Sequence, residues 1–589
     1  MPRLRSIAAT STLALALTAL AAAPAGAISS SESGVTGEQQ YVVLFAEGAS
    51  ADATRAAVAA AGGTIVAENA AVGVATVVTT ESDFAAEAAA QPAIEGTALN
   101  RVIADVPDAA KGAGAAEKFD TAKADLRSTE GAGSAAAAAP ATRPSNGRPL
   151  AEPLADLQWD MQAIDATVDG SYRHDKTKGV LVGILDTGVD GSHPDIAPNF
   201  DAELSRNFTV DVPVDANGDP IDGDCAEEPD QSCDDAADVD ENGHGTHVAS
   251  TIGSPINGIG IAGVAPDVTL VNLRAGQDSG YFFLQASVDA LTYAGDNGID
   301  VVNMSYYVDP WLFNCTSHPA DSPEDQAEQQ TIITAMQRAL DYARGNGVTL
   351  VAAAGNQAAD YTKAYVDSSS PDFASVPGEV AYTRDLLDPA SCISMPGEAE
   401  GVIAVSSTGQ SERKAYYSSY GNGFVDIAAP GGDIYDNAEA TRQYPGGILA
   451  AYPAALAEAE GAIDENGDVV VPWAVQSCDA SGENCGYYQY LQGTSMASPH
   501  AAGVVALIVG EYGTKDKVHG GKTLSPAVTE SVLLSTAVDT ACPVPAAFTY
   551  VRHLPNGTTA TTTHTCEGEP TKNGFYGDGI VNALAAIGR

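Results

Sequence analysis

The most restrictive feature of this sequence is an alternation, from about residue 154 onward, of short apolar runs with helical stretches. The apolar runs are rich in β-branched residues and cover residues 180–185, 268–273, 299–304, 349–354 and 402–405. The helical stretches cover residues 244–252, 286–296, 326–346 and 495–512. Short apolar strands that alternate with helices are typical of a parallel sheet covered on both faces. We therefore predict an α/β domain over residues 151–589, with its functional site at the carboxyl ends of the strands.

A smaller unit precedes this domain. Its pattern predicts strands at residues 41–45, 64–66, 72–78 and 101–106, with helices at 51–61 and 83–90. This β-α-β-β-α-β order indicates a small α+β domain over residues 38–107. Residues 108–150 are rich in Ala, Gly, Ser and Pro, which is the composition of a linker.

The N-terminus predicts export. Arg3 and Arg5 precede an apolar run at residues 13–23, which ends at the small residues Ala25-Gly26-Ala27. A charged region, a short apolar region and a small-residue cleavage site are typical of a signal peptide, here residues 1–27. The run is too short to span a bilayer, although a core helix at the N-terminus is the alternative. We expect a secreted, extracellular protein.

The cysteines agree with this compartment. All eight lie after residue 220, and an even count in an exported chain suggests disulfides. Pairing between neighbours closes short loops and is our expectation, although 105 pairings are possible for eight cysteines. The expected pairs are 225–233, 315–392, 478–485 and 542–566. Zinc binding is the competing interpretation, but no pair has CxxC spacing.

The charge of the chain excludes one class of partner. Asp and Glu number 77 against 28 Lys and Arg, a formal net charge of −49. Such a field repels nucleic acid and anionic lipid, so we expect neither as a partner. We also take the chain to be a monomer. Residues 211–240 hold twelve of the acids. The segments at 215–219 and 464–468 resemble half of a calcium loop, but solvated insertions are the favoured interpretation.

Four polar residues stand at strand ends or helix starts. Asp186 directly follows the run at 180–185, and Asn356 follows the run at 349–354. His244 lies between two glycines at a helix start, and Ser495 lies at the start of an apolar helix. Taken alone, these residues could be a turn cap, a loop amide, a metal ligand paired with His247, and an N-cap. Together, an acid, a base, a hydroxyl and an amide donor form an acyl-transfer constellation.

The chain order Asp, His, Ser excludes an α/β-hydrolase, which runs Ser, Asp, His with its serine in GxSxG. The sequence instead resembles the subtilisin-like serine proteases over about residues 155–589. The matching segments are 184–190, 193–195, 242–249, 301–305, 352–356 and 493–500. The resemblance implies a secreted serine endopeptidase. In it Ser495 is the nucleophile, His244 the base and Asp186 its partner, and Asn356 with the Ser495 N–H holds the oxyanion.

The resemblance also implies where a peptide substrate binds. Ser305, Ala353, Ala354 and Gly355 would offer backbone to an extended peptide. The family usually has glycine two residues after the serine equivalent to Ser305, but this chain has Tyr306-Tyr307. We therefore expect a narrower cleavage preference than that of a general digestive protease.

Calcium is the cofactor that the resemblance implies. Its ligands would be the side chains of Asp195 and Asn257 and the carbonyl groups of Pro255, Ile259 and Ile261, an all-oxygen set. The alternative is a plain turn at Asn257-Gly258.

The resemblance finally makes residues 38–107 an inhibitor-like prodomain. The protein would then be a zymogen that cleaves itself within 108–150, with the prodomain as inhibitor and folding template. Two other functions stay open: a dedicated processing peptidase for a partner precursor, and a non-catalytic peptide-binding module on the same fold.

Overall fold

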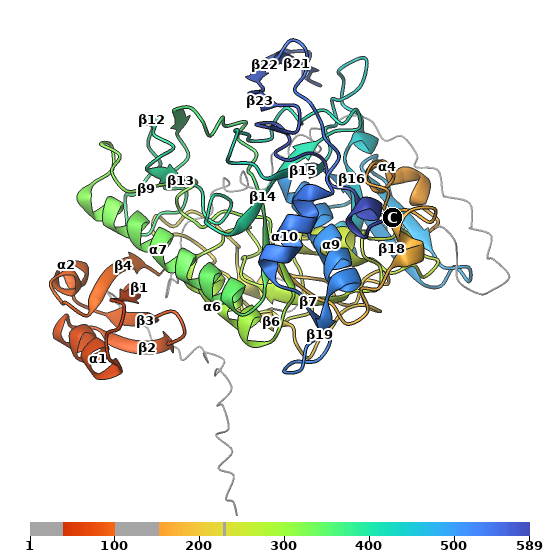
Figure 1. Ribbon diagram of the computed structural model, residues 1–589. Helices are drawn as coiled ribbons and strands as arrows, with labels where there is room; N and C mark the ends of the chain where they lie inside the picture. The colour runs from red at the N-terminus through yellow and green to blue at the C-terminus, as the bar shows by residue number, and fades with distance from the viewer. Residues whose placement is uncertain (1–38, 101–151, 228–230) are drawn as a thin grey trace, which may run out of the picture. The chain divides into compact units, whose positions relative to one another are not determined.

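The computed structural model describes residues 39–100, 152–227 and 231–589 (Figure 1). The expected signal peptide, the linker at 108–150 and the strand expected at 101–106 lie outside these residues. Within them, no helix has both the length and the apolar character that crossing a membrane requires.

Residues 39–100 form an antiparallel sheet of four strands, in the order β2-β3-β1-β4, with two helices. The elements are β1 (Gln39–Phe45), α1 (Ala51–Ala60), β2 (Thr64–Asn69), β3 (Val74–Thr79), α2 (Phe84–Ala89) and β4 (Ile94–Leu99). The first five elements occur in the predicted order, and the structure adds β4, which was not predicted. Strand β4 contains Glu95 and Gly96, which interrupt its apolar pattern and hide it in the sequence.

The large domain contains a sheet of seven strands in the order β15-β14-β10-β8-β5-β7-β6, and all neighbouring strands are parallel. The strands are β5 (Leu181–Leu185), β6 (Arg206–Asn207), β7 (Thr269–Arg274), β8 (Val301–Met304), β10 (Thr349–Ala353), β14 (Val402–Thr408) and β15 (Ile427–Pro430). All five predicted apolar runs are strands of this sheet, which confirms the predicted α/β class.

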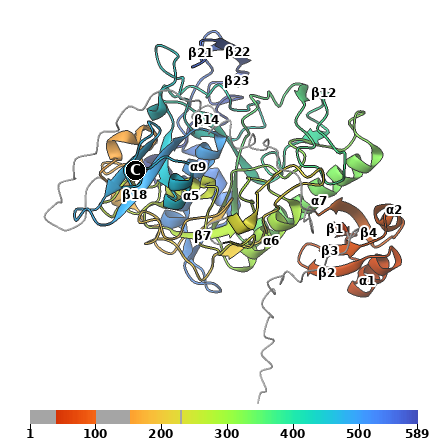
Figure 2. The ribbon, with the colours of Figure 1, turned by 180° about the vertical axis from the view of Figure 1, so that it is seen from behind.

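Helices cover both faces of the large sheet (Figure 1, Figure 2). They are α5 (His244–Gly253), α6 (Leu284–Asp296), α7 (Pro323–Gly345), α9 (Thr494–Tyr512) and α10 (Pro526–Ser535). Ile184 of β5 belongs to the core shared with α5 and α9, whereas the next residue, Leu185, belongs to the core shared with α6 and α7. Because successive strand residues point to opposite faces, one continuous apolar run supplies both cores.

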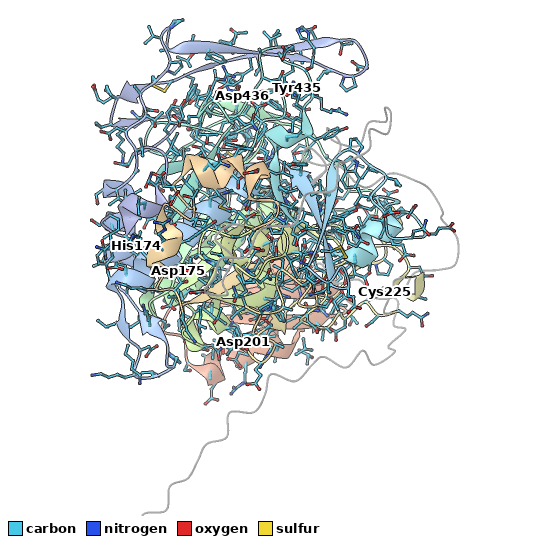
Figure 3. The ribbon with its side chains drawn as sticks, turned by 90° about the vertical axis from the view of Figure 1, so that its right-hand side faces the viewer. His174, Asp175, Asp201, Cys225, Tyr435 and Asp436 are labelled. Atoms are coloured by element: carbon cyan, nitrogen blue, oxygen red, sulfur yellow. A yellow bond between two sulfur atoms is a disulfide. The ribbon has the colours of Figure 1, made fainter. Side chains whose placement is uncertain are left out.

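Smaller elements surround this framework. They are α4 (Trp159–Ala163), β9 (Asn314–Cys315), β11 (Tyr365–Asp367), β12 (Arg384–Leu387), β13 (Cys392–Ile393), β16 (Ile448–Tyr452), α8 (Ala454–Ala459), β17 (Ala474–Cys478), β18 (Cys485–Leu491), β19 (Thr514–Lys515), β20 (Lys522–Thr523), β21 (Ala547–His553), β22 (Thr559–Thr565), β23 (Gly568–Glu569), β24 (Lys572–Asn573) and α11 (Ala583–Ala586). The β21–β22 hairpin lies at the top of Figure 3, just above the labelled Tyr435 and Asp436. The His553 N–H of this hairpin donates to the Ala440 carbonyl at 2.8 Å.

Four disulfides tie the periphery of the domain, and they pair the cysteines as neighbours along the chain, as predicted. They are Cys225–Cys233, Cys315–Cys392, Cys478–Cys485 and Cys542–Cys566. Cys225 is labelled in Figure 3. The Cys315–Cys392 bridge joins the paired strands β9 and β13, and these cysteines therefore bind no zinc.

Candidate functional site

An acid and a histidine meet where β5 ends and α5 begins. Asp186 follows β5 and is fully buried, and His244 is the first residue of α5. The Nδ1 atom of His244 lies 2.6 Å from the Oδ1 atom of Asp186. The contact depends on Gly245, because a β-carbon there would lie 2.1 Å from the Gly188 carbonyl oxygen. The glycine that flanks His244 is thus required by the close approach of two backbones.

Ser495 lies in the first turn of α9, which packs beside α5 in the same core. Its Oγ atom donates to the Ser305 carbonyl at 3.2 Å. The Ser305 hydroxyl in turn donates to the Ser495 carbonyl at 3.1 Å. A helix N-terminus favours negative charge nearby, because its first N–H groups lack intrahelical partners. The serine is therefore placed where an anionic intermediate is stabilised.

Asn356 is held so that its amide nitrogen serves the same place. Its Oδ1 atom accepts hydrogen bonds from the N–H and the hydroxyl of Thr494, both at 2.9 Å. A β-carbon built on Gly493 would lie 3.6 Å from the Asn356 Nδ2 atom and 3.6 Å from the Ser495 nitrogen. Two N–H donors therefore flank one small region, as an oxyanion site requires.

The residues expected to bind substrate, 305–307 and 353–355, lie in two segments beside Ser495, which we call the substrate walls. One is 305–308, after β8, and the other is 353–355, at the end of β10. The two tyrosines of the first wall differ. The Tyr306 ring is buried and stacks on Phe282 with ring centroids 4.1 Å apart, so it belongs to the core. Tyr307 is partly buried and donates its hydroxyl to Asp372 Oδ2 at 2.8 Å.

The residues expected to bind calcium lie together, because the loop at 255–261 packs against Asp195. Asp195 is fully buried and accepts hydrogen bonds from the Asn257 side chain and the Ile261 N–H, both at 3.0 Å. Pro255 and Ile259 lie in the same loop. Burial, followed by the charge of Glu152, raises the pKa of Asp195 well above its usual range. Glu152 is also buried and accepts from the Gly258 N–H at 2.7 Å.

These residues supply oxygen atoms of the kind that calcium binds. In this structure the Asn257 Oδ1 atom accepts from the Ile259 N–H at 2.9 Å, and Asp195 Oδ2 also accepts from the Tyr488 hydroxyl at 3.1 Å. Two carboxylates buried side by side repel each other, and the loop adds carbonyl oxygens of the kind that calcium prefers. Glu152 was not predicted as a member of this site. Nothing in the sequence distinguishes it from the many other acids of the chain.

The second histidine of the 242–249 segment is a core residue and does not form a metal pair with His244. The His247 ring is fully buried, and its Nε2 atom lies 3.0 Å from the Ile448 carbonyl oxygen. Burial lowers the pKa of His247 to about 3, so the ring is neutral.

The acidic insertion at 211–240 is not simply a solvated loop, which corrects the prediction. Asp211 and Asp235 are buried and both contact the buried guanidinium of Arg274, which also contacts Asp278 at 3.0 Å. Carboxylate oxygens of the three aspartates come within 4.8 Å of one another, but Arg274 already supplies the cation at this cluster. The segments at 215–219 and 464–468 are tight turns, in which Asp215 and Asp464 cap backbone N–H groups.

Sequence and structure comparisons place the chain among known proteins. The subtilase family profile matches residues 177–579. The chain is 28% identical over 344 residues to the thermophilic serine proteinase of Bacillus sp. (strain AK1), covering 58% of this chain and 55% of that protein. It is 26% identical over 364 residues to subtilisin DY of Bacillus licheniformis, covering 62% and 85%. The chain thus spans about half the length of the first relative and most of the second.

Two solved structures share the fold. The epidermin leader peptide processing serine protease EpiP from Staphylococcus aureus superimposes with a TM-score of 0.57 at 20% identity, covering 94% of this chain and 98% of that one. Fervidolysin from Fervidobacterium pennivorans superimposes with a TM-score of 0.52 at 20% identity, covering 94% and 61%.

Proposed function

The chain belongs to the subtilase family, and from this we propose that it is a secreted serine endopeptidase made as a self-processing zymogen. The observation that carries the proposal is the 2.6 Å contact of His244 with buried Asp186, at the same strand ends as Ser495 and Asn356. Calcium is its proposed structural cofactor, and a peptide or protein is its substrate.

The proposed reaction proceeds in two halves. The Ser495 Oγ atom attacks the carbonyl carbon of the scissile bond, and its proton passes to His244 Nε2. Asp186 orients the ring through Nδ1 and stabilises its cationic form. The oxyanion is held by the Ser495 N–H and the Asn356 amide. His244 then protonates the leaving amine, which leaves an acyl-enzyme that water hydrolyses by the same steps.

The small unit at 38–107 is the proposed inhibitor and folding template. Support comes from contacts within the compact unit formed by residues 37–589. Asn69 donates to Asp289 on α6 at 2.7 Å, and Arg338 on α7 donates to the Phe45 carbonyl at 2.8 Å. A parallel sheet with many non-local contacts folds slowly, so a template bound to its helices assists folding.

Calcium would be held by the Asp195 and Glu152 carboxylates, the Asn257 side chain and the loop carbonyl groups of Pro255, Ile259 and Ile261. When bound, the ion would neutralise the two buried carboxylates and fix the loop at 255–261. Its proposed role is structural, since this loop carries none of the four reacting groups.

A dedicated processing peptidase for a partner precursor is the second candidate. Tyr307 favours it, because a tyrosine bound to Asp372 replaces the small residue expected in the substrate wall. Digestion of a mixed peptide pool separates the two functions, since a broad peptidase cuts many of its members and a dedicated one very few.

Labelling with a fluorophosphonate tests the proposed chemistry. The wild-type protein is expected to be labelled at Ser495, whereas Ser495→Ala is not. A wild-type protein that resists labelling and cuts no peptide would be a binding module. N-terminal sequencing of secreted wild-type and Ser495→Ala proteins tests maturation: the variant is expected to keep its prodomain, and a matured variant without added protease refutes self-processing.

A further inference from the structure

A short loop, residues 394–398, contacts both substrate walls, and we call it the floor loop. On one side, the Val308 N–H donates to the Met395 carbonyl at 2.9 Å. On the other side, a β-carbon on Gly397 would lie 2.8 Å from the Ala353 carbonyl oxygen, so only glycine allows this approach. The floor loop therefore closes the space between walls 305–308 and 353–355.

Glu398 is the one ionisable residue of the floor loop. Its Oε2 atom accepts a hydrogen bond from the Ser394 N–H at 2.7 Å. Its Oε1 atom is buried and has no hydrogen-bond partner among the described residues. A buried carboxylate oxygen without a partner is costly, and such groups are normally paired with a donor or a cation.

Among the residues that the structure describes, no Lys, Arg or His forms an ion pair with Glu398. The titratable groups that interact electrostatically with Glu398 are two tyrosines outside the substrate walls, Tyr361 and Tyr365. The Tyr361 hydroxyl donates to the Ala354 carbonyl at 2.6 Å, and the Tyr365 hydroxyl donates to the Cys392 carbonyl at 3.1 Å. Both hydroxyls are thus committed to backbone. Burial raises the pKa of Glu398 to about 8, against the lowering effect of the Ser394 N–H.

The geometry points to Glu398 as the residue that selects the substrate: we propose that it pairs with a lysine or arginine side chain on the acyl side of the scissile bond. This inference rests on the proposed peptidase function. In this proposal a peptide lies between the two walls, and its side chain nearest Ser495 extends toward the floor loop. A long cationic side chain would supply the donor that the Oε1 atom lacks, and its charge would favour the ionised carboxylate.

The test compares two fluorogenic peptides that differ only in arginine or leucine at that position. We expect the wild-type enzyme to prefer arginine in kcat/KM. Removing one partner of a desolvated charge pair is costly, so Glu398→Gln should lower kcat/KM for the arginine peptide by about 10- to 100-fold. The leucine peptide should change by less than about threefold. Glu400→Gln, an exposed acid two residues away, is the matched control and should leave both rates unchanged.

Two results overturn the inference. One is a wild-type enzyme that cuts the leucine peptide as well as the arginine peptide, which is decisive even if Glu398→Gln fails to fold. The other is an equal loss on both peptides in Glu398→Gln, which would make the residue merely structural. Either result leaves the proposed chemistry intact, because Ser495 would still be labelled. Failure of labelling with no cleavage of either peptide would instead reject the peptidase function itself.

Discussion

A buried contact between a histidine and an aspartate ties the helix that carries Ser495 to α4. His500 on α9 and Asp160 on α4 are both fully buried, with His500 Nε2 3.0 Å from Asp160 Oδ2. The other ring nitrogen, Nδ1, lies 2.8 Å from the Met496 carbonyl oxygen. Both ring nitrogens therefore have a hydrogen-bond partner in the core.

Replacing Asp160 by Asn should therefore destabilise the domain strongly. The change keeps the side-chain volume, so no cavity is created. What is lost is the carboxylate that contacts His500, and leaving a buried polar group without a suitable partner costs about 1–3 kcal/mol. No discount for solvent screening applies, because neither side chain is exposed.

Equilibrium urea unfolding of the full chain measures this cost. Every protein carries Ser495→Ala, which removes self-digestion. The matched control is Asp156→Asn, an exposed acid of the same segment, which should change the unfolding free energy by less than about 0.5 kcal/mol. The double variant with His500→Gln should lose less than the sum of the two single variants. A loss below about 1 kcal/mol for Asp160→Asn would refute the reasoning.

Three further results are expected. Asp186→Asn should lower kcat by roughly 10⁴-fold with little change in KM, because the ring of His244 loses its orienting partner; a loss under about tenfold contradicts the triad. The arginine-to-leucine ratio of kcat/KM should rise with pH through about 8, where the raised pKa of Glu398 places its ionisation, and a flat ratio argues against pairing. EDTA should lower the Tm of the wild-type protein but not that of Asp195→Asn, which has lost its carboxylate; calorimetry that shows equal shifts rejects the calcium site.

The residues proposed to react could be located in the sequence, because close backbone contacts require glycines around them. Gly245 is an example, since the approach of Gly188 permits no side chain there. The strands of the large sheet could also be predicted, because burial on both faces produces unbroken apolar runs such as 180–185. Strand β4 could not, since its Glu95 and Gly96 break that pattern.

The supporting residues could not be predicted, because their roles arise from packing across long stretches of chain. Asp211 is 63 residues from Arg274 in sequence, and nothing local marks it as its partner. Tyr306 and Tyr307 are adjacent, yet one enters the core and the other faces Asp372. A sequence shows that two tyrosines are present, but the backbone direction decides which of them can act on a substrate.

The buried acids of the large domain can be sorted by what neutralises them. Asp235 contacts the guanidinium of Arg274, and Asp160 contacts the ring of His500. Asp195 has a second carboxylate beside it in a loop of carbonyl groups, an arrangement suited to a metal ion. Within the described part of the chain, Glu398 has none of these, only one N–H and two tyrosines whose hydroxyls donate to backbone carbonyl groups. Each of the other three acids has a partner side chain or a set of oxygens that could bind a metal ion. We therefore infer that the partner of Glu398 is supplied by a molecule that binds reversibly. Its place between the two substrate walls makes that molecule the substrate.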